Sequence, residues 1–434
     1  MVRARDMALG GLLAIAAATS ANAQTAPNPT QGPAPAPAAP VASSPIDLFY
    51  LARQQAPIWL KDDAGRAGAQ AMAAVLRNAA IDGLQDGPER AARVEAAIAA
   101  NDDKAVSAEW VAYVQALKAP VKGVSYGDPA LQLQPPTPGA ILAKAAAAPS
   151  LTEYVTRTAA VNPFYASIRD NALRLGQTQD PHVRGTLERL RLVPAQGRAI
   201  LVDVANAELM MIEDVSVVDQ MKVVVGKPGF ETPMLAGTIH YVTFNPYWHI
   251  PQDVVRRKVA PIVLKRGVSY LKAARYQTVA AFGKGEDPID PTTVDWKAVA
   301  DGSVEVHIRQ LTGPQNMMGK MKFGFVNDYG IFLHDTPHKD YFAKPKRNLS
   351  LGCIRVEHPE RLAQWLLGRE PVPSGEDAEE LVQVDKGVPI YVSSLTARAD
   401  GDKLVFANDV YGLDKQGAEN VTKVAAADGD SRAQ

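Results

Sequence analysis

The sequence predicts an α+β protein in which an N-terminal all-α scaffold domain precedes a mostly antiparallel, β-sandwich-like domain with a helical insertion. Alanine-rich stretches with apolar residues at helical spacing extend from residue 45 to about residue 192. After Pro194 the pattern changes to short β-branched runs separated by glycine, proline or acidic residues, which is typical of strands. Two helix-like segments interrupt these runs after a turn at residues 245–248.

The composition is that of a folded chain without a dominant charge. Of the 434 residues, 47% are hydrophobic and 21% are charged, which excludes a wholly disordered, collagen-like or coiled-coil protein. Lysine and arginine number 46 against 47 acidic residues, a net charge of −1. This balance gives no bulk electrostatic reason to expect nucleic acid or an anionic membrane as a partner, although it allows a local basic patch.

The N-terminus has the pattern of an export signal. Two arginines precede an apolar run over residues 7–18, and Ala21-Asn22-Ala23 forms a small-residue cleavage site, so residues 1–23 are expected to be a removable signal peptide. The run is shorter than the roughly 20 residues that a spanning helix needs, which disfavours a membrane anchor. We therefore expect a periplasmic protein. Residues 24–45, rich in proline and alanine, are expected to form an extended linker.

Residues 46–194 are expected to form the scaffold domain, with six to eight helices. Apolar residues recur at helical spacing in several places, for example Leu48, Leu51 and Ala52 near the start and Trp110, Val111 and Val114 further on.

Residues 195–396 are expected to form the β-rich domain, with the insertion at about residues 246–300. We predict strands at 199–204, 209–212, 215–225, 238–244, 304–308, 322–326, 331–334, 354–356 and 389–392. Helices are predicted at 251–265, 268–275 and 359–367. Residues 397–434 are expected to contain a strand or helix and a loose tail from residue 415.

The most informative residues surround the only cysteine, Cys353, which excludes an intramolecular disulfide and a multi-cysteine metal cage. His334 closes one predicted strand and Cys353 precedes another, so the two side chains can meet if these strands pair. An imidazole that takes the thiol proton would activate Cys353 as a nucleophile. Gly352 permits a sharp turn that aims backbone amides at an oxyanion. The second imidazole nitrogen needs an acceptor, for which a main-chain carbonyl near Asp335, or the Asp335 carboxylate, is nearest.

His334 followed by Ser350-x-Gly352-Cys353-Ile354-Arg355 resembles the L,D-transpeptidase catalytic domain of the YkuD type. The similarity covers about residues 183–395. Within that family the sequence most resembles the large periplasmic YcbB-like subgroup. The residues that carry this resemblance are the segments 245–251, 223–228 and 334–337, together with Phe342, Arg347 and Ser350.

This resemblance implies a reaction at peptidoglycan stem peptides. Cys353 would attack the bond between an L-centre and a D-residue, a D-amino acid would leave, and a diaminopimelate amine of a neighbouring stem would resolve the thioester into a 3-3 or 1-3 crosslink, with His334 relaying protons. The insertion resembles a lid over the active site. No cofactor is implied, carbapenems are expected to inhibit, and cell-wall synthesis proteins are candidate partners.

The sequence departs from the family pattern in three places. Leu351 stands where many members carry His or Asn, and Phe332 stands where the subgroup often has Tyr. No peptidoglycan-binding repeat is recognisable before the β-rich domain. The crosslink type and the acceptor preference therefore stay open.

The remaining site residues have both functional and structural interpretations. Arg355 can bind a stem carboxylate or form a structural pair, and Arg347 and Ser350 favour structural roles. Tyr247 and Trp248 can line the substrate cleft or belong to a core. A metal site built on His334, His338, His358 and Asp335 is disfavoured because Pro337 interrupts any helix that would place His334 and His338 on one face.

Two other functions remain open beside transpeptidation. The same thioester can be resolved by water, which would make the protein an L,D-carboxypeptidase or another thiol hydrolase. Alternatively, the protein is a non-catalytic wall scaffold whose helical domain carries the function.

Overall fold

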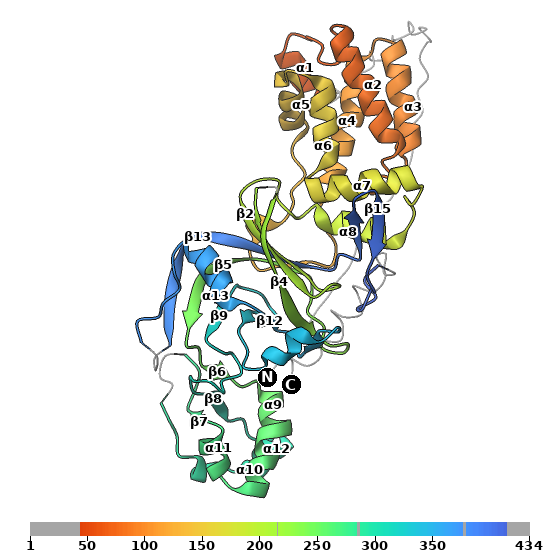
Figure 1. The fold of residues 1–434 in the computed structure, drawn as a ribbon. Coiled ribbons are helices and arrows are strands. Elements are labelled where there is room, and N and C mark those ends of the chain that lie inside the picture. The colour runs from red at the N-terminus through yellow and green to blue at the C-terminus, as the bar shows by residue number, and fades with distance from the viewer. Residues whose placement is uncertain (1–43, 215, 284–286, 376–378, 415–434) are drawn as a thin grey trace, which may run out of the picture. The chain divides into compact units, whose positions relative to one another are not determined.

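The computed structural model describes residues 44–214, 216–283, 287–375 and 379–414 (Figure 1). The predicted signal peptide, almost all of the predicted linker and the tail from residue 415 lie outside these ranges. The first helix begins at Pro45, with the Ser44 hydroxyl accepting the Asp47 amide, so the last residue of the predicted linker is helical. No helix in these ranges is both long and apolar enough to cross a bilayer.

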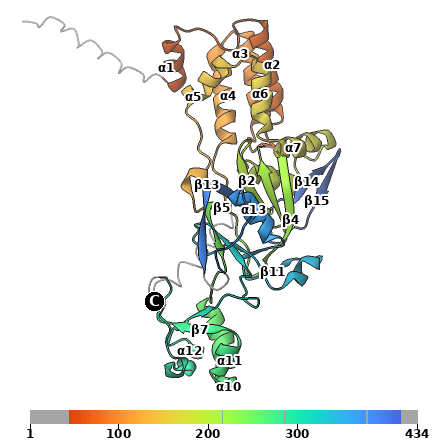
Figure 2. The same cartoon turned by 60° about the vertical axis from the view of Figure 1, so that its left-hand side comes forward.

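Among the described residues, eight helices precede the first long strand, as the periodicity predicts. They are α1 (Pro45–Ala52), α2 (Asp63–Arg77), α3 (Gly87–Ala99), α4 (Asp103–Leu117), α5 (Pro138–Ala147), α6 (Leu151–Ala160), α7 (Pro163–Leu175) and α8 (Pro181–Leu190). Most begin at a polar side chain that caps a free amide, such as Asp62, Asp102 and Asn162. Figure 2 shows α2, α3, α4 and α6 lying side by side.

The scaffold core is aromatic at its centre. Trp59 and Trp110 are fully buried with ring centroids 6.1 Å apart, and Tyr50 is 1% exposed. Leu48 and Leu51, expected on the buried face of α1, are instead 54% and 63% exposed. The physical reason is that Tyr50, with its hydroxyl on Ser107, fills the position against α4 and turns these two leucines outward.

The β-rich domain is organised around one ten-stranded sheet. Its strands are β1 (Ser125–Tyr126), β2 (Arg198–Asp203), β3 (Glu208–Glu213), β4 (Ser216–Gly226), β5 (Leu235–Phe244), β9 (Met321–Gly324), β10 (Leu333–His334), β11 (Asn348–Ser350), β12 (Ile354–Val356) and β13 (Glu380–Ser393). The order is β1-β5-β13-β2-β3-β4-β12-β10-β9, with β11 beside β4. Most neighbours are antiparallel, as predicted.

The sheet closes on itself, because β5 also pairs with β9. The strands thus form one continuous circuit instead of the two separate sheets of a sandwich, and alternate side chains point into a shared apolar interior. Phe323, Leu333 and Ile354 lie in that interior at 0% exposure. Helix α13 (Pro359–Leu367) packs Leu362 and Leu366 on the same cluster.

The insertion after β5 is a small α/β subdomain that extends to about residue 310, ten residues beyond the predicted limit. It contains β6 (Trp248–His249), α9 (Gln252–Val254), a π-helical turn (Val255–Val259), α10 (Ala260–Arg266), α11 (Ser269–Ala273), β7 (Tyr276–Val279), α12 (Trp296–Asp301) and β8 (His307–Gln310). The strands pair in the order β6-β8-β7 and pack against the helices around their own core, which includes Val255, Val263 and Ile308 (Figure 1).

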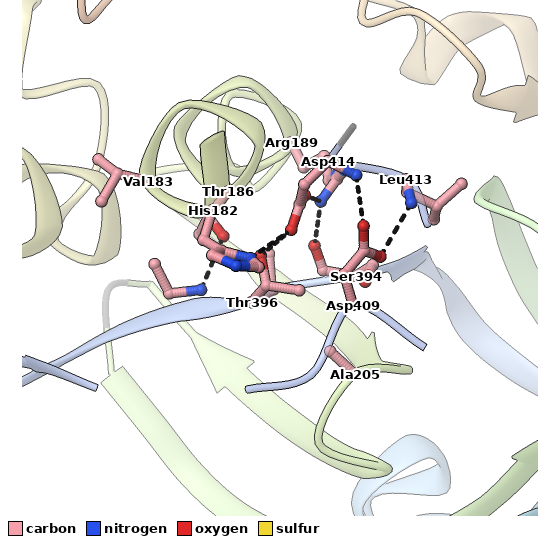
Figure 3. A network of polar contacts seen from close by, with 12 residues as sticks. His182, Val183, Thr186, Arg189, Ala205, Ser394, Thr396, Asp409, Leu413 and Asp414 are labelled. Atoms are coloured by element: carbon pink, nitrogen blue, oxygen red, sulfur yellow. Dashed lines mark hydrogen bonds and ion pairs between the residues drawn. The ribbon is translucent and has the colours of Figure 1, made fainter. Parts of the chain in front are cut away.

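The end of the described chain returns to α8. After the hairpin of β14 (Ala397–Asp400) and β15 (Lys403–Phe406), the Asp414 carboxylate accepts from Arg189 Nη1 at 2.6 Å and from the Thr396 hydroxyl at 2.5 Å, and it lies 2.8 Å from His182 Nδ1 (Figure 3). Asp409 accepts the backbone amide of Asp414, which fixes the last turn (Figure 3). Residues 397–414 contain strands and no helix.

Candidate active site

The pairing of β10 with β12 brings the histidine and cysteine segments together, as the sequence requires. The two strands are parallel, with Leu333 opposite Ile354 and His334 opposite Arg355. The Ile354 amide donates to the Phe332 carbonyl at 3.1 Å, so Phe332 lies opposite Cys353. Because side chains alternate along a strand, Phe332, His334, Cys353 and Arg355 lie on the same face of the pair, on the side away from Leu333 and Ile354. Cys353 also packs against the edge of the apolar cluster.

His334 is held in one orientation. The residue is 2% exposed, and its Nδ1 lies 2.5 Å from the main-chain carbonyl oxygen of Asp335. A carbonyl can only accept, so Nδ1 carries the proton and Nε2 keeps a free lone pair. The Phe332 ring packs edge-on against the imidazole at 5.7 Å. This tautomer is the one that a proton acceptor needs.

The Asp335 carboxylate has a different role from its carbonyl. It accepts the Lys320 amide at 2.8 Å and the Lys339 ammonium at 2.7 Å, and it packs against Gly319, where a Cβ would lie 2.3 Å from the carboxylate oxygen. Of the two acceptors that the sequence left open, the carbonyl is therefore the one that orients His334.

The turn before Cys353 depends on glycine. Gly352 has φ of +119°, a conformation that residues with a Cβ rarely adopt. Its amide donates to the buried Ser350 hydroxyl at 3.1 Å, and its carbonyl accepts from the Thr232 hydroxyl at 2.6 Å. The Gly352 amide is therefore already occupied and is not free for an oxyanion, contrary to expectation. The Cys353 amide remains the candidate donor.

Both reacting groups are neutral at rest. Burial, together with the nearby positive charge of Arg355, lowers the pKa of His334 to about 3. Burial raises the pKa of the Cys353 thiol, although the Phe332 backbone and the charges of Arg355 and Lys322 oppose the shift. In the described structure His334 and Cys353 form no hydrogen bond with each other, and Cys353 Sγ lies 3.9 Å from the Gly330 carbonyl oxygen.

Arg355 is a cation without a partner in this site. Its Nε and Nη1 are both buried and have no hydrogen-bond acceptor, and its guanidinium lies 5.5 Å from the centroid of the Tyr341 ring. Lys322, opposite His334 on β9, lies 4.6 Å from the centroid of the Phe332 ring. A buried guanidinium with two unused donors is costly unless an anion pairs with it. Arg355 is therefore available to an anionic ligand.

Arg347 and Ser350 both make structural contacts, which is the interpretation that the sequence favours. Arg347 donates to the backbone carbonyls of Val223, Asn206 and Ala207, so it ties β4 to the turn between β2 and β3. Ser350 is 2% exposed and supports the Gly352 turn.

The rings of Tyr247 and Trp248 contact residues of the insertion, and the Tyr247 amide donates to the Glu379 carboxylate outside it. The Arg309 guanidinium lies 4.5 Å from the centroid of the Tyr247 ring. Trp248 packs edge-on against Tyr276 at 6.4 Å and belongs to the core of the subdomain. The structure thus gives both residues a packing role at the base of the insertion.

Sequence reasoning missed three residues that shape the site, namely Thr232, Lys322 and Tyr341. Thr232 follows a turn more than 100 positions before Cys353, and only the pairing of β4, β11 and β12 makes it a neighbour. Lys322 could have been found from the predicted strand at 322–326. Within the described ranges no three His, Cys, Asp or Glu side chains are grouped as metal ligands.

Comparison with known proteins agrees with this architecture. Residues 197–392 match the model of the L,D-transpeptidase catalytic domain, YkuD, and residues 44–171 match the model of a scaffold domain. A putative L,D-transpeptidase of Haemophilus influenzae is 24% identical over 385 residues, which cover 85% of this chain and 78% of that protein.

Solved L,D-transpeptidases match the chain over a shorter length. An L,D-transpeptidase from Mycobacterium smegmatis is 15% identical, with a TM-score of 0.24, and the match covers 46% of this chain and 59% of that one. L,D-transpeptidase 3 from Mycobacterium tuberculosis, in complex with a faropenem-derived adduct, is 12% identical, with a TM-score of 0.22, over 46% and 60%. The match thus spans about three fifths of each of these solved chains.

The fold and the site define an enzyme in which a β-rich catalytic domain follows a helical scaffold domain. The chain contains an L,D-transpeptidase catalytic domain, YkuD, at residues 197–392, and a scaffold domain precedes it.

Proposed function

We propose that this protein crosslinks peptidoglycan stem peptides through a thioester on Cys353. The observation that carries the proposal is the shared face of β10 and β12, on which Cys353 lies diagonally across from an imidazole whose Nε2 is free to accept a proton. The family supplies the substrate class, and the residues of this chain supply the roles below.

In the first half-reaction the Cys353 sulfur attacks the carbonyl carbon of the bond between an L-centre and a D-residue. The thiol proton passes to His334 Nε2, and the imidazolium then returns it to the leaving amine of the D-residue. Because the resting pair is neutral, proton transfer accompanies attack and no preformed thiolate is needed. The Cys353 amide donates to the developing oxyanion.

In the second half-reaction an amine of a neighbouring stem attacks the thioester carbon. Its proton passes to His334, the C–S bond breaks, and the departing Cys353 thiolate takes that proton back from His334, which leaves an amide crosslink between the two stems. Arg355 would pair with a carboxylate of one stem, because its buried Nε and Nη1 have no acceptor among the described residues. The insertion after β5 is proposed to act as the lid, as in the YcbB-like subgroup.

The place of action is part of the same proposal. The signal pattern at residues 1–23 and the proline-rich segment at 24–45 support export to the periplasm and a spacer before the scaffold domain. Peptidoglycan lies in that compartment, and inhibition by carbapenems is expected because a thioester-forming cysteine also opens their ring.

Product analysis tests this proposal and separates it from hydrolysis. The mature chain, residues 24–434, is incubated with purified disaccharide-linked stem tetrapeptides, and the products are identified by mass spectrometry. Transpeptidation yields dimers and a released D-amino acid, whereas an L,D-carboxypeptidase yields trimmed monomers.

Matched variants assign the products to the site. Cys353→Ala and His334→Gln are expected to abolish both products, and His358→Gln, at an exposed histidine, is expected to behave as wild type. Turnover retained in Cys353→Ala would refute the dyad. Absence of any product from the wild-type chain would favour a non-catalytic scaffold.

A further inference from the structure

The insertion carries the densest positive charge of the described chain. Residues 252–275 contain seven lysines and arginines and one acidic residue, Asp253, a net charge of +6 within a chain of net charge −1. Six of these cations form what we call the basic face, and they all lie on α9 to α11 or the π-helical turn: Arg256, Arg257, Lys258, Lys265, Arg266 and Lys272. All six side chains are exposed.

The π-helical turn is what exposes three consecutive cations. Val254 and Val255 are buried, and the next buried pair is Val259 and Ala260, five positions later, which is the repeat of a π-turn and not of an α-helix. Pro261 follows at the start of α10 and lacks the amide that a regular helix would use, which favours this irregularity. The wider turn leaves 256–258 on the outside.

Within the described ranges no carboxylate forms an ion pair with the basic face. None of its six side chains forms an ion pair or a hydrogen bond, whereas scaffold cations such as Arg90 and Arg93 both pair with Glu109. Arg256 lines a hollow with Asp253 and Glu305, without a bond to either.

Other carboxylates of the subdomain are used elsewhere. Asp290, Asp295 and Asp301 lie near α12, and each accepts backbone amides of its own turn: those of Thr292, of Lys297 and Ala298, and of Ser303. Such caps leave these carboxylates engaged with their own helix ends. The basic face therefore projects a positive field into solvent that the fold itself does not neutralise.

We propose that the basic face binds the carboxylates of peptidoglycan stem peptides outside the catalytic pocket and so holds the polymer on the enzyme. This inference rests on the proposed function, which makes a polyanionic polymer the substrate. Charge complementarity favours this occupant. A membrane is less suitable, because the one large apolar side chain exposed on these helices within the described ranges is Leu264, too little apolar area for insertion.

The test is co-sedimentation of the mature chain with purified insoluble peptidoglycan at about 0.01, 0.15 and 1 M salt. Affinity should fall steeply with salt for the wild type. The triple variant Arg257→Gln/Lys258→Gln/Lys265→Gln should bind about tenfold more weakly at 0.15 M, which is what three exposed charge pairs supply together. Amidation of the peptidoglycan carboxylates should weaken binding of the wild-type protein. The loss should be as large as the one caused by the triple substitution with the unmodified polymer.

A matched control carries the same change in net charge. Lys122→Gln/Lys144→Gln/Lys403→Gln removes three exposed lysines from outside the insertion and should bind like wild type. Both triple variants should be acylated by a carbapenem at the wild-type rate, which shows that the fold and the site are intact.

Two results would overturn the inference. One is equal peptidoglycan binding by wild type and the Arg257/Lys258/Lys265 variant. The other is a loss that appears only with phosphatidylglycerol vesicles, which would assign the face to a membrane. Product analysis with soluble stems tests the proposed function separately, so crosslinking without charge-dependent sedimentation would refute this inference alone.

Discussion

The pH dependence of Cys353 reactivity tests whether the resting dyad is neutral. Burial raises the pKa of the thiol and lowers the pKa of His334 to about 3, so no imidazolium is present near neutral pH to stabilise a thiolate. An ordinary thiol with a pKa of about 8.5 is about 3% ionised at pH 7. Cys353 should be ionised less than this. Its alkylation rate should therefore climb about tenfold per pH unit through the neutral range.

The assay is iodoacetamide alkylation of Cys353, followed by intact mass between about pH 5 and pH 9.5. Arg355→Gln should lower the rate at each pH below the plateau, because the Arg355 charge lowers the pKa of the thiol. Lys403→Gln, at an exposed lysine far along the chain, should leave the profile unchanged. A rate that is already constant between pH 5 and pH 8 would refute the reasoning, since it would mean a preformed thiolate–imidazolium pair.

Three stability predictions follow from buried polar groups and can be measured by urea unfolding. As the pH falls from 6.5 to 4, the free energy of unfolding of His334→Gln should rise by about 3 kcal/mol relative to that of wild type. The reason is that the unfolded histidine binds a proton in this range and the folded one, with a pKa of about 3, does not. A difference between the two proteins that does not change with pH would contradict this. Thr232→Val should lower the free energy of unfolding by about 2 kcal/mol and slow carbapenem acylation, because the Gly352 carbonyl loses its donor and the Gly226 amide loses its acceptor. Unchanged acylation would show that Thr232 does not support the turn before Cys353. Asp414→Ala should lower the free energy of unfolding by about 3 kcal/mol, because Arg189, which is 5% exposed, loses its carboxylate partner. An unchanged urea midpoint would show that residues 407–414 do not anchor to α8.

Local pattern was sufficient for much of the fold. The strands at 199–204, 209–212 and 354–356 and the helix at 359–367 lie within a residue or two of β2, β3, β12 and α13, because apolar periodicity and flanking turns mark each of them. The closure of the sheet through β5 and β9 was not predictable, since it depends on pairing between segments some 80 residues apart. The exposed Leu48 and Leu51 show the same limit, because periodicity cannot say which neighbouring aromatic fills the core.

The sequence predicted those features of the site that depend on the types of residue present. A histidine at the end of one strand and Gly352-Cys353 before the next sufficed to predict that these two segments lie side by side and that a glycine turn precedes the cysteine. What the sequence could not supply is the partner of each polar group. Arg347 proved to bond backbone carbonyls, the Gly352 amide proved to be occupied by Ser350, and the unpaired donors of Arg355 became visible only with burial.

If Cys353 carries the acyl group during the reaction, the acyl-enzyme can be trapped when no acceptor is present. A stem tetrapeptide is mixed with the mature chain without acceptor amine, quenched in acid and digested for tandem mass spectrometry. We expect a mass gain equal to the stem less its terminal D-residue, located on Cys353, released by hydroxylamine and absent from Cys353→Ala. An acyl group on any other residue, or turnover by Cys353→Ala, would contradict it.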